Sequence, residues 1–338
     1  MADAREQVLA ESYDLLMFDL DGVVYVDGRA VAAAPEGIAA SRAAGAQVAF
    51  ITNNASRTSA QVAAHLRDLG IQAADEDVVT SSQAAARVLR DRYGAGAAIA
   101  VLGTDGLLTA LREAGLEPVD VDVERAVAIV SGYAPEVRWK VLMQAAVRIR
   151  NGLPWVATNT DPTLPTGAGP APGHGTLVRM ISEFADVVPV VAGKPEEPLF
   201  DETLRRVGGA HPLMIGDSLH TDIAGAHNAG IDSLLVLTGV TDLAGLARAR
   251  SDQRPTWIGH DLSSLGRPGA RAERQDGQWS AGGWTARIDD GRLVVEGSGA
   301  GDAWWSCVGP ALWGHLDAVG EPADTSGVVA PEPDRARG

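Results

Sequence analysis

Short apolar runs alternate with longer stretches rich in alanine and leucine along most of the chain. One apolar run ends at Phe18 and precedes a helical pattern over residues 35–44, and a second ends at Ile51 and precedes a helical pattern over residues 59–69. Strands that alternate with helices of this length are typical of βαβ units and a parallel sheet. We therefore predict an α/β fold with a Rossmann-like parallel-sheet core.

A second block with the same rhythm interrupts this core. Its predicted elements are strands over residues 98–102, 126–130 and 154–158, and helices over residues 106–114 and 135–149. The first block then resumes and closes with predicted strands over residues 233–237 and 256–258. We predict a core formed by residues 10–82 and 185–265, with an α/β domain inserted over residues 83–184.

After Arg267 the composition changes to a tryptophan-rich segment in which apolar and polar positions alternate. Such alternation is typical of strands, and disordered segments are poor in aromatic residues. We predict a small Trp-rich C-terminal appendage of β or α+β structure over residues 268–320, and a disordered tail over residues 321–338. We expect the tryptophans to pack against the core, although a subunit contact would also account for them. They are Trp279, Trp284, Trp304, Trp305 and Trp313.

Two carboxylates follow the first apolar run in the pattern Asp19-Leu20-Asp21-Gly22. Side chains two positions apart on a strand point to the same side, so Asp19 and Asp21 start out aimed together before the chain turns at Gly22. Paired carboxylates can hold a hard cation, or divide the roles of nucleophile and acid/base between them. Acidic pairs are also common in loops, so this pattern alone is not specific.

Three later apolar runs lead into reactive polar turns in the same way. Residues 48–51 precede Thr52-Asn53-Asn54, residues 188–192 precede Gly193-Lys194-Pro195, and residues 213–215 precede Asp217, with Asp222 five positions further on. Open α/β sheets bind their ligands at the carboxyl ends of their strands. The order of carboxylate pair, hydroxyl, lysine and carboxylate pair is far more specific than any one piece.

This set resembles the haloacid dehalogenase superfamily of phosphatases, over residues 13–261. The position of the insertion resembles that of the large α/β cap in the nitrophenylphosphatase-like branch. Residues 157–161, followed by a Gly/Pro-rich loop, and residues 216–223 are similar to sequences of that branch. The resemblance implies a phosphatase whose cap determines substrate specificity.

The resemblance implies that Asp19 is the nucleophile, which attacks phosphorus and forms an aspartyl-phosphate. Asp21 would protonate the leaving group and then activate the hydrolytic water. The ATPase branch of the superfamily has threonine at the second position, so the carboxylate favours rapid hydrolysis of the intermediate. The alternatives are that Asp19 caps a turn and that Asp21 is a solvated loop residue.

The resemblance assigns substrate binding to Thr52, Asn53, Asn54 and Lys194. Thr52 would donate its hydroxyl to the phosphoryl group, and the asparagine amides would assist at the start of the following helix, where free N–H groups suit an anion. Thr52 could instead cap that helix. Lys194 would neutralise charge on the phosphoryl group and on the nucleophile, unless it is a solvated surface lysine.

The resemblance also implies a Mg²⁺ site formed by Asp19, Asp217 and the main-chain carbonyl of Asp21. Mg²⁺ retains several waters, so few protein ligands suffice. Asp222 would hold metal waters or Lys194 from the second coordination sphere; alternatively, it is an N-terminal helix residue favoured by the helix dipole.

In the cap, the loop over residues 161–175 is long enough to close on substrate. His174 and Arg179 are candidate substrate contacts, but His174 could equally be an exposed loop residue. Many relatives carry an acidic residue in a Gly-x-Asp stretch where this chain has Gly132-Tyr133-Ala134. This departure weakens any detailed substrate inference from the cap.

Composition narrows the possible partners. The formal net charge of −16 argues against nucleic acid, which requires clustered Lys and Arg. The single cysteine, Cys307, excludes an intramolecular disulfide and fits a reducing compartment. The polar start and the lack of a long apolar run predict neither a signal peptide nor a membrane span. We expect a cytoplasmic protein, and nothing in the sequence indicates a homo-oligomer.

The sequence therefore predicts a Mg²⁺-dependent phosphomonoesterase, with a small phosphorylated metabolite as substrate because a large cap leaves little room for a phosphoprotein. The Ala/Gly-rich composition resembles that of mycobacterial glycerol 3-phosphate phosphatases of this branch, which favours glycerol 3-phosphate and a role in glycerolipid metabolism. 2-Phosphoglycolate is the near alternative, followed by aryl and nucleoside monophosphates. A phosphomutase or phosphotransferase, and a regulatory binding protein acting through the C-terminal segment, are more remote.

Overall fold

A computed structural model describes residues 8–332 except residues 165 and 168. The chain divides into two compact units. The first comprises Met1–Val48, Leu69–Ile71 and Gly209–Gly338, and the second comprises Ala49–Asp68 and Gln72–Gly208. Each unit has a hydrophobic core of its own. Among the described residues, no helix combines the length and apolar character that crossing a membrane requires.

The first unit is built on parallel strands in the order β15-β14-β13-β1. These are β1 (Leu15–Asp19), β13 (Pro212–Gly216), β14 (Asp232–Val236) and β15 (Trp257–Gly259). Residues 15–18 are all fully buried, as expected for an apolar strand covered on both faces of a parallel sheet. Leu15 pairs with Pro212 and Phe18 with Ile215, so β1 and β13 end at the same edge of the sheet.

Short helices and one hairpin complete the parallel part of this unit. They are η1 (Leu9–Ser12), α1 (Ala34–Ala43), a π-helical turn η3 (Leu219–Ile223), α8 (Ala224–Asn228), α9 (Leu243–Ala247), η4 (Ser251–Gln253), η5 (Leu262–Gly266), and the hairpin strands β2 (Tyr25–Val26) and β3 (Arg29–Ala30). The π-helical turn follows β13 directly and runs into α8, so it lies next to the edge where β1 and β13 end.

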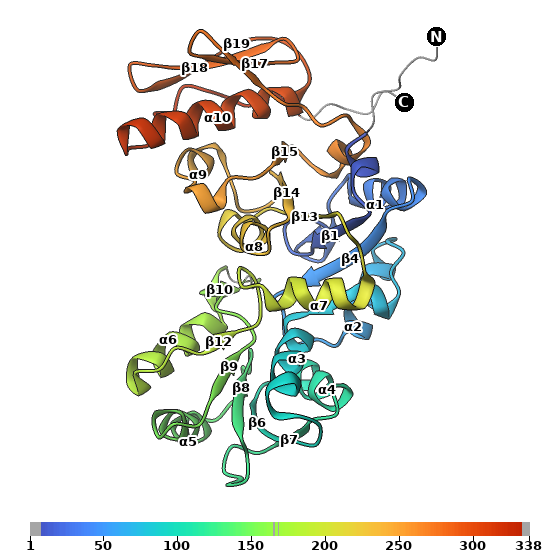
Figure 1. Ribbon diagram of the computed structural model, residues 1–338, viewed down its shortest axis with the longest axis vertical. Helices are drawn as coiled ribbons and strands as arrows, with labels where there is room; N and C mark the ends of the chain where they lie inside the picture. The colour runs from blue at the N-terminus through green and yellow to red at the C-terminus, as the bar shows by residue number, and fades with distance from the viewer. Residues whose placement is uncertain (1–7, 165, 168, 333–338) are drawn as a thin grey trace. The chain divides into compact units, whose positions relative to one another are not determined.

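The C-terminal part of the first unit is an antiparallel meander covered by a helix (Figure 1). Its elements are β16 (Glu273–Gln275), β17 (Gln278–Ala281), β18 (Trp284–Asp289), β19 (Arg292–Gly297) and α10 (Gly301–Val319). The three two-residue loops are Asp276-Gly277, Gly282-Gly283 and Asp290-Gly291, and every loop residue has a positive φ. Positive φ at both positions is the signature of type I′ hairpins, whose twist matches that of the strands.

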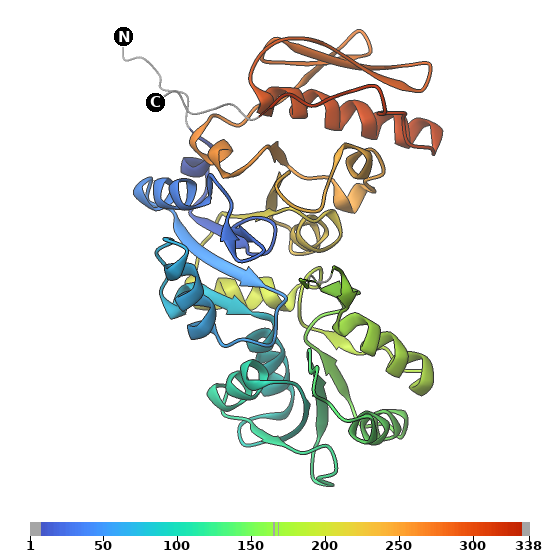
Figure 2. The same cartoon turned by 180° about the vertical axis from the view of Figure 1, so that it is seen from behind.

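The tryptophans of α10 belong to the core of this unit. Trp304 and Trp305 are 2% and 4% exposed, and they share one hydrophobic cluster with Leu246 of α9, Ile258 of β15 and Ala286 of β18. The prediction that the tryptophans pack against the core is confirmed for Trp304 and Trp305. Figure 2 shows the same packing of α10 against the meander from the opposite side.

The segment after α10 returns to the meander. Ala323 is buried, the Leu293 N–H donates to the Asp324 carbonyl at 3.0 Å, and the Asp324 N–H donates to the Gly291 carbonyl at 2.8 Å. The beginning of the segment that we expected to be disordered is therefore bonded to β19. Residues 333–338 of that predicted tail lie outside the described residues.

The second unit contains a five-stranded parallel sheet in the order β12-β9-β8-β6-β7. Its strands are β6 (Ala98–Leu102), β7 (Glu117–Val119), β8 (Ala128–Ser131), β9 (Trp155–Ala157) and β12 (Val190–Val191), accompanied by α4 (Asp105–Glu113), α5 (Trp139–Arg150), α6 (His174–Ala185) and the hairpin strands β10 (Thr163–Leu164) and β11 (Ala171–Pro172). The last strand, β12, lies beyond residue 184, the end predicted for the inserted domain.

The second unit also carries the end of β4 (Gln47–Thr52), which pairs in parallel with β5 (Val78–Thr80). The remaining elements are α2 (Ser59–Asp68), η2 (Asp75–Asp77), α3 (Ser81–Tyr93) and α7 (Pro198–Val207). Thr80 caps α3: its hydroxyl accepts from the Gln83 N–H, and the Gln83 amide oxygen accepts from the Thr80 N–H. This cap directs the chain from β5 into α3.

Candidate active site

Three carboxylates of the first unit form one cluster. Asp19 ends β1, Asp217 follows β13, and Asp222 lies in the π-helical turn; one ligand oxygen from each lies within 4.8 Å of the others. Asp217 and Asp222 are buried and Asp19 is partly buried, and carboxylates at this spacing repel one another unless a cation lies between them. Because carboxylate oxygens are the ligands that Mg²⁺ prefers, the donor set fits a magnesium ion.

The Asp217 side chain is oriented by the loop after β14. The Val240 N–H donates to Oδ2 of Asp217 at 2.7 Å, and the Thr241 hydroxyl donates to the Asp217 main-chain carbonyl at 2.5 Å. On the same loop, the Thr238 hydroxyl donates to the Gly22 carbonyl at 2.6 Å. The loop thus connects the turn after β1 to the turn after β13.

Two glycines leave the space that this carboxylate occupies. A Cβ on Gly22, whose φ is +90°, would lie 2.3 Å from Oδ2 of Asp217, and a Cβ on Gly239 would lie 1.8 Å from the same atom. Real Cβ atoms do not approach other heavy atoms so closely, so both positions require glycine. Our sequence reasoning missed the loop over residues 238–241. The Thr-Gly pair directly after an apolar strand was the signal that could have revealed it.

Asp222 holds the turn that carries Asp217. Its Oδ2 accepts from the Asp217 N–H at 3.2 Å and from the Ser218 N–H at 3.0 Å. These bonds orient the backbone beside the cluster. Asp21, by contrast, is exposed, and its carboxylate does not belong to the cluster of three found among the described residues.

Lys194 of the second unit is 2% exposed and follows β12. The side-chain amide of Asn53 forms a reciprocal pair with its main chain: the Lys194 N–H donates to Oδ1 at 2.8 Å, and Nδ2 donates to the Lys194 carbonyl at 3.0 Å. Nδ2 of Asn53 also donates to Oδ1 of Asp161 at 3.1 Å. The side chain of Asn53 therefore orients the main chain at Lys194. The alternative of a solvated surface lysine is wrong.

Thr52 ends β4 and is buried, and its hydroxyl oxygen accepts from the Asn54 N–H at 3.0 Å. The amide oxygen of Asn54 in turn accepts from the N–H and the hydroxyl of Ser56. The following helix begins only at Ser59, where Thr58 and the side chain of Gln61 bond reciprocally. The alternative that Thr52 caps this helix is therefore wrong.

His174 lies in the first turn of α6 and is 4% exposed. Nδ1 lies 2.9 Å from the Asn159 carbonyl oxygen and Nε2 lies 3.1 Å from the Ser131 hydroxyl. Burial lowers the pKa of His174 to about 4, although the bond to Asn159 opposes the shift. The alternative of an exposed loop residue is wrong. Arg179, the other candidate contact, is exposed on the same helix.

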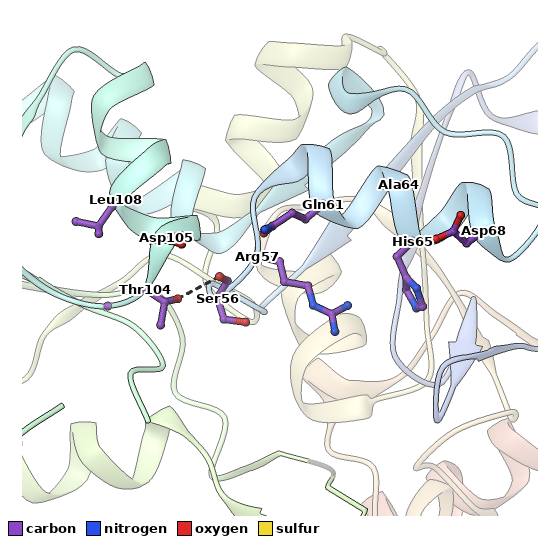
Figure 3. Close-up of a pocket in the computed structure, with 10 residues that line it drawn as sticks. Ser56, Arg57, Gln61, Ala64, His65, Asp68, Thr104, Asp105 and Leu108 are labelled. Carbon is purple, nitrogen blue, oxygen red and sulfur yellow. Dashed lines mark hydrogen bonds between the residues drawn. The ribbon is translucent and has the colours of Figure 1, made fainter. Parts of the chain in front are cut away.

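A groove of about 770 Å³ lies beside α2 in the second unit (Figure 3). It begins at Ser56, two residues after Asn54, and the Thr104 hydroxyl donates to the Ser56 carbonyl at 3.1 Å. Its lining is polar at Arg57, Gln61, His65, Asp68 and Asp105. Thr52 and Lys194 are not among the lining residues, so the groove is separate from the buried lysine.

The structure thus brings the predicted residues together in two sets. Asp19, Asp217 and Asp222 converge in the first unit, and Asn53 contacts Lys194 in the second. Asp19 lies far from Asp217 in sequence, and Asn53 lies far from Lys194, because each set assembles from the ends of different strands.

The family of the chain follows from its sequence relatives. A model described as haloacid dehalogenase-like hydrolase matches residues 16–117, and one described as HAD-hydrolase-like matches residues 191–265. The chain belongs to the haloacid dehalogenase-like hydrolases. It is 42% identical over 257 residues to the D-glycerol 3-phosphate phosphatase of Mycobacterium tuberculosis, an alignment that covers 76% of this chain and 72% of that protein. It is 35% identical to a 5′-nucleotidase of Bacillus subtilis, over 68% of this chain and 90% of that one.

Solved structures agree with this family. The glycerol phosphate phosphatase of Mycobacterium tuberculosis in complex with magnesium has a TM-score of 0.82 at 37% identity, covering 92% of this chain and 93% of that chain. The p-nitrophenyl phosphatase of Archaeoglobus fulgidus has a TM-score of 0.70 at 27% identity, covering 75% of this chain and 98% of that chain. The predicted superfamily, nitrophenylphosphatase-like branch and parallel α/β fold are confirmed.

Proposed function

We propose that this chain is a Mg²⁺-dependent phosphomonoesterase that hydrolyses glycerol 3-phosphate. The observation that carries the proposal is the cluster of Asp19, Asp217 and Asp222 at the ends of neighbouring parallel strands. The relatives support the reaction class, because those at 42% and 35% identity are named as phosphatases or nucleotidases. The relative named for D-glycerol 3-phosphate covers 76% of this chain, which supports the substrate.

The reaction proceeds in two displacements at phosphorus. A carboxylate oxygen of Asp19 attacks the phosphoryl group, the bond to the leaving oxygen breaks, and that oxygen takes a proton from the Asp21 carboxyl group. Asp21, now ionised, takes a proton from water, and the hydroxide attacks the aspartyl-phosphate. Inorganic phosphate leaves, while Asp19 and Asp21 regain their starting states. The exposed position of Asp21 suits a residue that exchanges protons with water.

We assign magnesium binding to the carboxylates of Asp19 and Asp217 and to the carbonyl of Asp21. When bound, Mg²⁺ neutralises the charge of the phosphoryl oxygens and of the carboxylates. Asp222 supports this set indirectly, because it accepts the Asp217 and Ser218 N–H groups. A magnesium complex is known for the related glycerol phosphate phosphatase.

We assign binding of the phosphoryl oxygens to the hydroxyl of Thr52, which the Asn54 N–H orients, the main-chain N–H group of Asn53, and the ammonium group of Lys194. Phosphoryl transfer depends mainly on positioning and charge neutralisation. A lysine that is 2% exposed and held through its main chain by Asn53 supports both requirements.

Other esters are the second choice. A nucleoside monophosphate is supported by the relative named as a 5′-nucleotidase, whereas 2-phosphoglycolate remains an alternative from the sequence alone.

We further propose a cytoplasmic location, since the single cysteine is free and buried and intracellular proteins are kept reduced. The predicted absence of nucleic-acid binding rests on the charge of −16.

The test is release of inorganic phosphate from a panel headed by glycerol 3-phosphate, 2-phosphoglycolate and a nucleoside monophosphate, with Mg²⁺ and with a chelator. Asp19→Asn should abolish turnover, and Asp289→Asn, at an exposed position of β18, is the matched control. A higher kcat/KM for another ester would replace the substrate. Absence of turnover on every ester by folded protein would contradict the phosphatase, and transfer to an added alcohol instead of water would indicate a phosphotransferase.

A further inference from the structure

A chain of buried hydrogen bonds runs through the second unit and ends at Lys194. At its far end, the Trp155 indole N–H donates to the Ser131 hydroxyl oxygen at 2.9 Å. Ser131 ends β8 and Trp155 begins β9. The Ser131 hydroxyl lies 3.1 Å from Nε2 of His174, and Nδ1 of His174 lies 2.9 Å from the Asn159 carbonyl oxygen. The imidazole thus bridges the end of β8 and the loop after β9.

The direction of each hydrogen bond follows from its partners. A carbonyl oxygen only accepts, so Nδ1 of His174 carries the proton. The ring is neutral at pH 7, because burial lowers its pKa to about 4, and Nε2 is therefore an acceptor. The Ser131 hydroxyl accepts from Trp155 and donates to Nε2. Every polar atom of this buried chain is satisfied, which is what rigidifies such networks.

The loop held by His174 contacts the residue that orients Lys194. Nδ2 of Asn159 donates to the Asn53 carbonyl at 2.7 Å, and Oδ1 of Asp161 accepts from Nδ2 of Asn53 at 3.1 Å. Asn53 in turn forms its reciprocal amide pair with the Lys194 main chain. Two independent contacts therefore connect the loop over residues 159–161 to Asn53.

Close packing removes alternative positions for these groups. A Cβ on Gly175 would lie 2.0 Å from the Thr160 carbonyl oxygen, and a Cβ on Gly173 would lie 2.4 Å from the Asp161 carbonyl oxygen. A Cβ on Gly193 would lie 2.5 Å from Oδ1 of Asn53. The glycines on both sides of His174 let the start of α6 pack directly against the loop over residues 159–161. Gly193 leaves room for the Asn53 side chain to contact Lys194.

We propose that His174 is a positioning residue for Lys194, acting through Asn159 and Asn53, and does not contact substrate. This inference rests on the proposed function for the catalytic role of Lys194. The hydrogen-bonded link between His174 and Lys194 does not depend on that function. Both ring nitrogens are used within the protein, and 4% exposure leaves no face of the ring for a ligand. His174 therefore acts on the reaction only through the lysine that it helps to hold.

The experiment compares His174→Phe, His174→Asn and the control His211→Phe in the full chain. Phenylalanine keeps the ring shape without its nitrogens, and asparagine keeps a donor near the position of Nδ1. His211 is exposed and its Nδ1 contacts the Ser12 carbonyl in the first unit, so its loss should not reach Lys194. The two readouts are kcat/KM for phosphate release and hydrogen exchange of the Lys194 backbone amide, which donates to Asn53.

His174→Phe should lower kcat/KM by about tenfold to a hundredfold, as expected for a displaced catalytic group. It should also speed exchange of the Lys194 amide by about tenfold or more, the effect of about 1.4 kcal/mol on a local opening equilibrium. His174→Asn should restore a large part of both, and His211→Phe should change neither. Unchanged exchange at Lys194 in folded His174→Phe would overturn the proposal, as would failure of asparagine to rescue either readout.

A second variant keeps the test decisive if His174→Phe does not fold. Ser131→Ala leaves the ring of His174 in place and removes the partner that Nε2 shares with the Trp155 indole. It should speed exchange at Lys194 by a smaller factor, and normal exchange in this variant would overturn the proposal. The exchange readout needs no turnover. If the wild type released no phosphate but exchange responded as expected, the proposed function would fail while the link between His174 and Lys194 would stand. If the wild type were active but exchange did not respond, the link would fail while the proposed function would stand.

Discussion

Replacing Trp304 by alanine should destabilise the first unit strongly. The side chain is 2% exposed and packs in a cluster that joins α10 to residues of α9, β15 and β18. An aromatic side chain buries about 150–250 Å², which at about 25 cal/mol per Å² corresponds to about 4–6 kcal/mol. Measured costs of Trp→Ala in cores are about 3–5 kcal/mol. We expect a loss of about 4 kcal/mol, a large part of a typical free energy of unfolding.

The assay is urea denaturation of the full chain followed by far-UV circular dichroism, which does not depend on the fluorescence of the removed indole. The matched control is Trp139→Ala, because Trp139 lies on α5 with 63% of its surface exposed and surface substitutions change stability by less than about 0.5 kcal/mol. The thermal midpoint of Trp304→Ala should also fall, by roughly 10 °C.

Equal losses in the two variants would refute the reasoning that burial of the Trp304 indole sets the cost. A loss below about 1 kcal/mol in Trp304→Ala, which is a typical value for any substitution, would have the same meaning. Phosphate release per folded molecule should persist at low temperature, since Trp304 is not among the proposed catalytic residues. Lost turnover in folded Trp304→Ala would indicate that the appendage takes part in function.

Three further predictions concern the site and its supports. Gly239→Ala should raise the Mg²⁺ concentration needed for half-maximal activity by about tenfold or more, because a metal site is sensitive to ligand position and the new Cβ would lie 1.8 Å from Oδ2 of Asp217. The control is Gly266→Ala, which has open space around it. Equal Mg²⁺ requirements in the two variants would contradict the argument. Asp21→Asn should slow hydrolysis of the aspartyl-phosphate. Acid quenching of a reaction with ³²P-labelled p-nitrophenyl phosphate, whose leaving group needs little help from a general acid, should therefore trap more phosphoenzyme than in the wild type. A lower phosphoenzyme level would count against Asp21 as the base. The pKa of His174 is about 4 in the folded chain against an ordinary value of 6.5, so only the unfolded chain binds this proton between these pH values. The free energy of unfolding should therefore lose up to about 3 kcal/mol from this group as pH falls from 6.5 to 4; urea titrations of His174→Asn should lack that share, and identical pH dependence in variant and wild type would exclude it.

Local pattern was sufficient for much of the parallel architecture. The predicted strand over residues 98–102 coincides with β6, and the predicted helix over residues 59–69 differs from α2 by one residue. Continuous apolar runs identify strands covered on both faces, whatever their neighbours. The alternation over residues 286–288 and 292–295 likewise marked parts of β18 and β19.

The appendage was predicted as β or α+β structure, but the position of helix α10 within it was not predicted, for an identifiable reason. It contains Pro310 in its interior, together with Gly309 and Gly314, and these residues have poor helix propensity. Burial of Trp304 and Trp305 outweighs that local preference. Propensity describes an isolated segment, whereas the helix is stabilised by the cluster against which it packs.

For the site, the sequence alone determined which residues are the candidates, because strand ends followed by reactive turns are visible in local pattern. Asp19 and Asp217 are found in this way, and Lys194 follows from the same pattern. Only the tertiary structure decided what holds them: Val240 bonds to Asp217 across 23 positions, and Asn53 bonds to Lys194 across 141. Such partners leave no periodic signal, since their proximity depends on how strands are ordered in a sheet. The burial of His174 in a Gly/Pro-rich stretch was decided in the same way, by hydrogen-bond partners that only the folded chain brings to it.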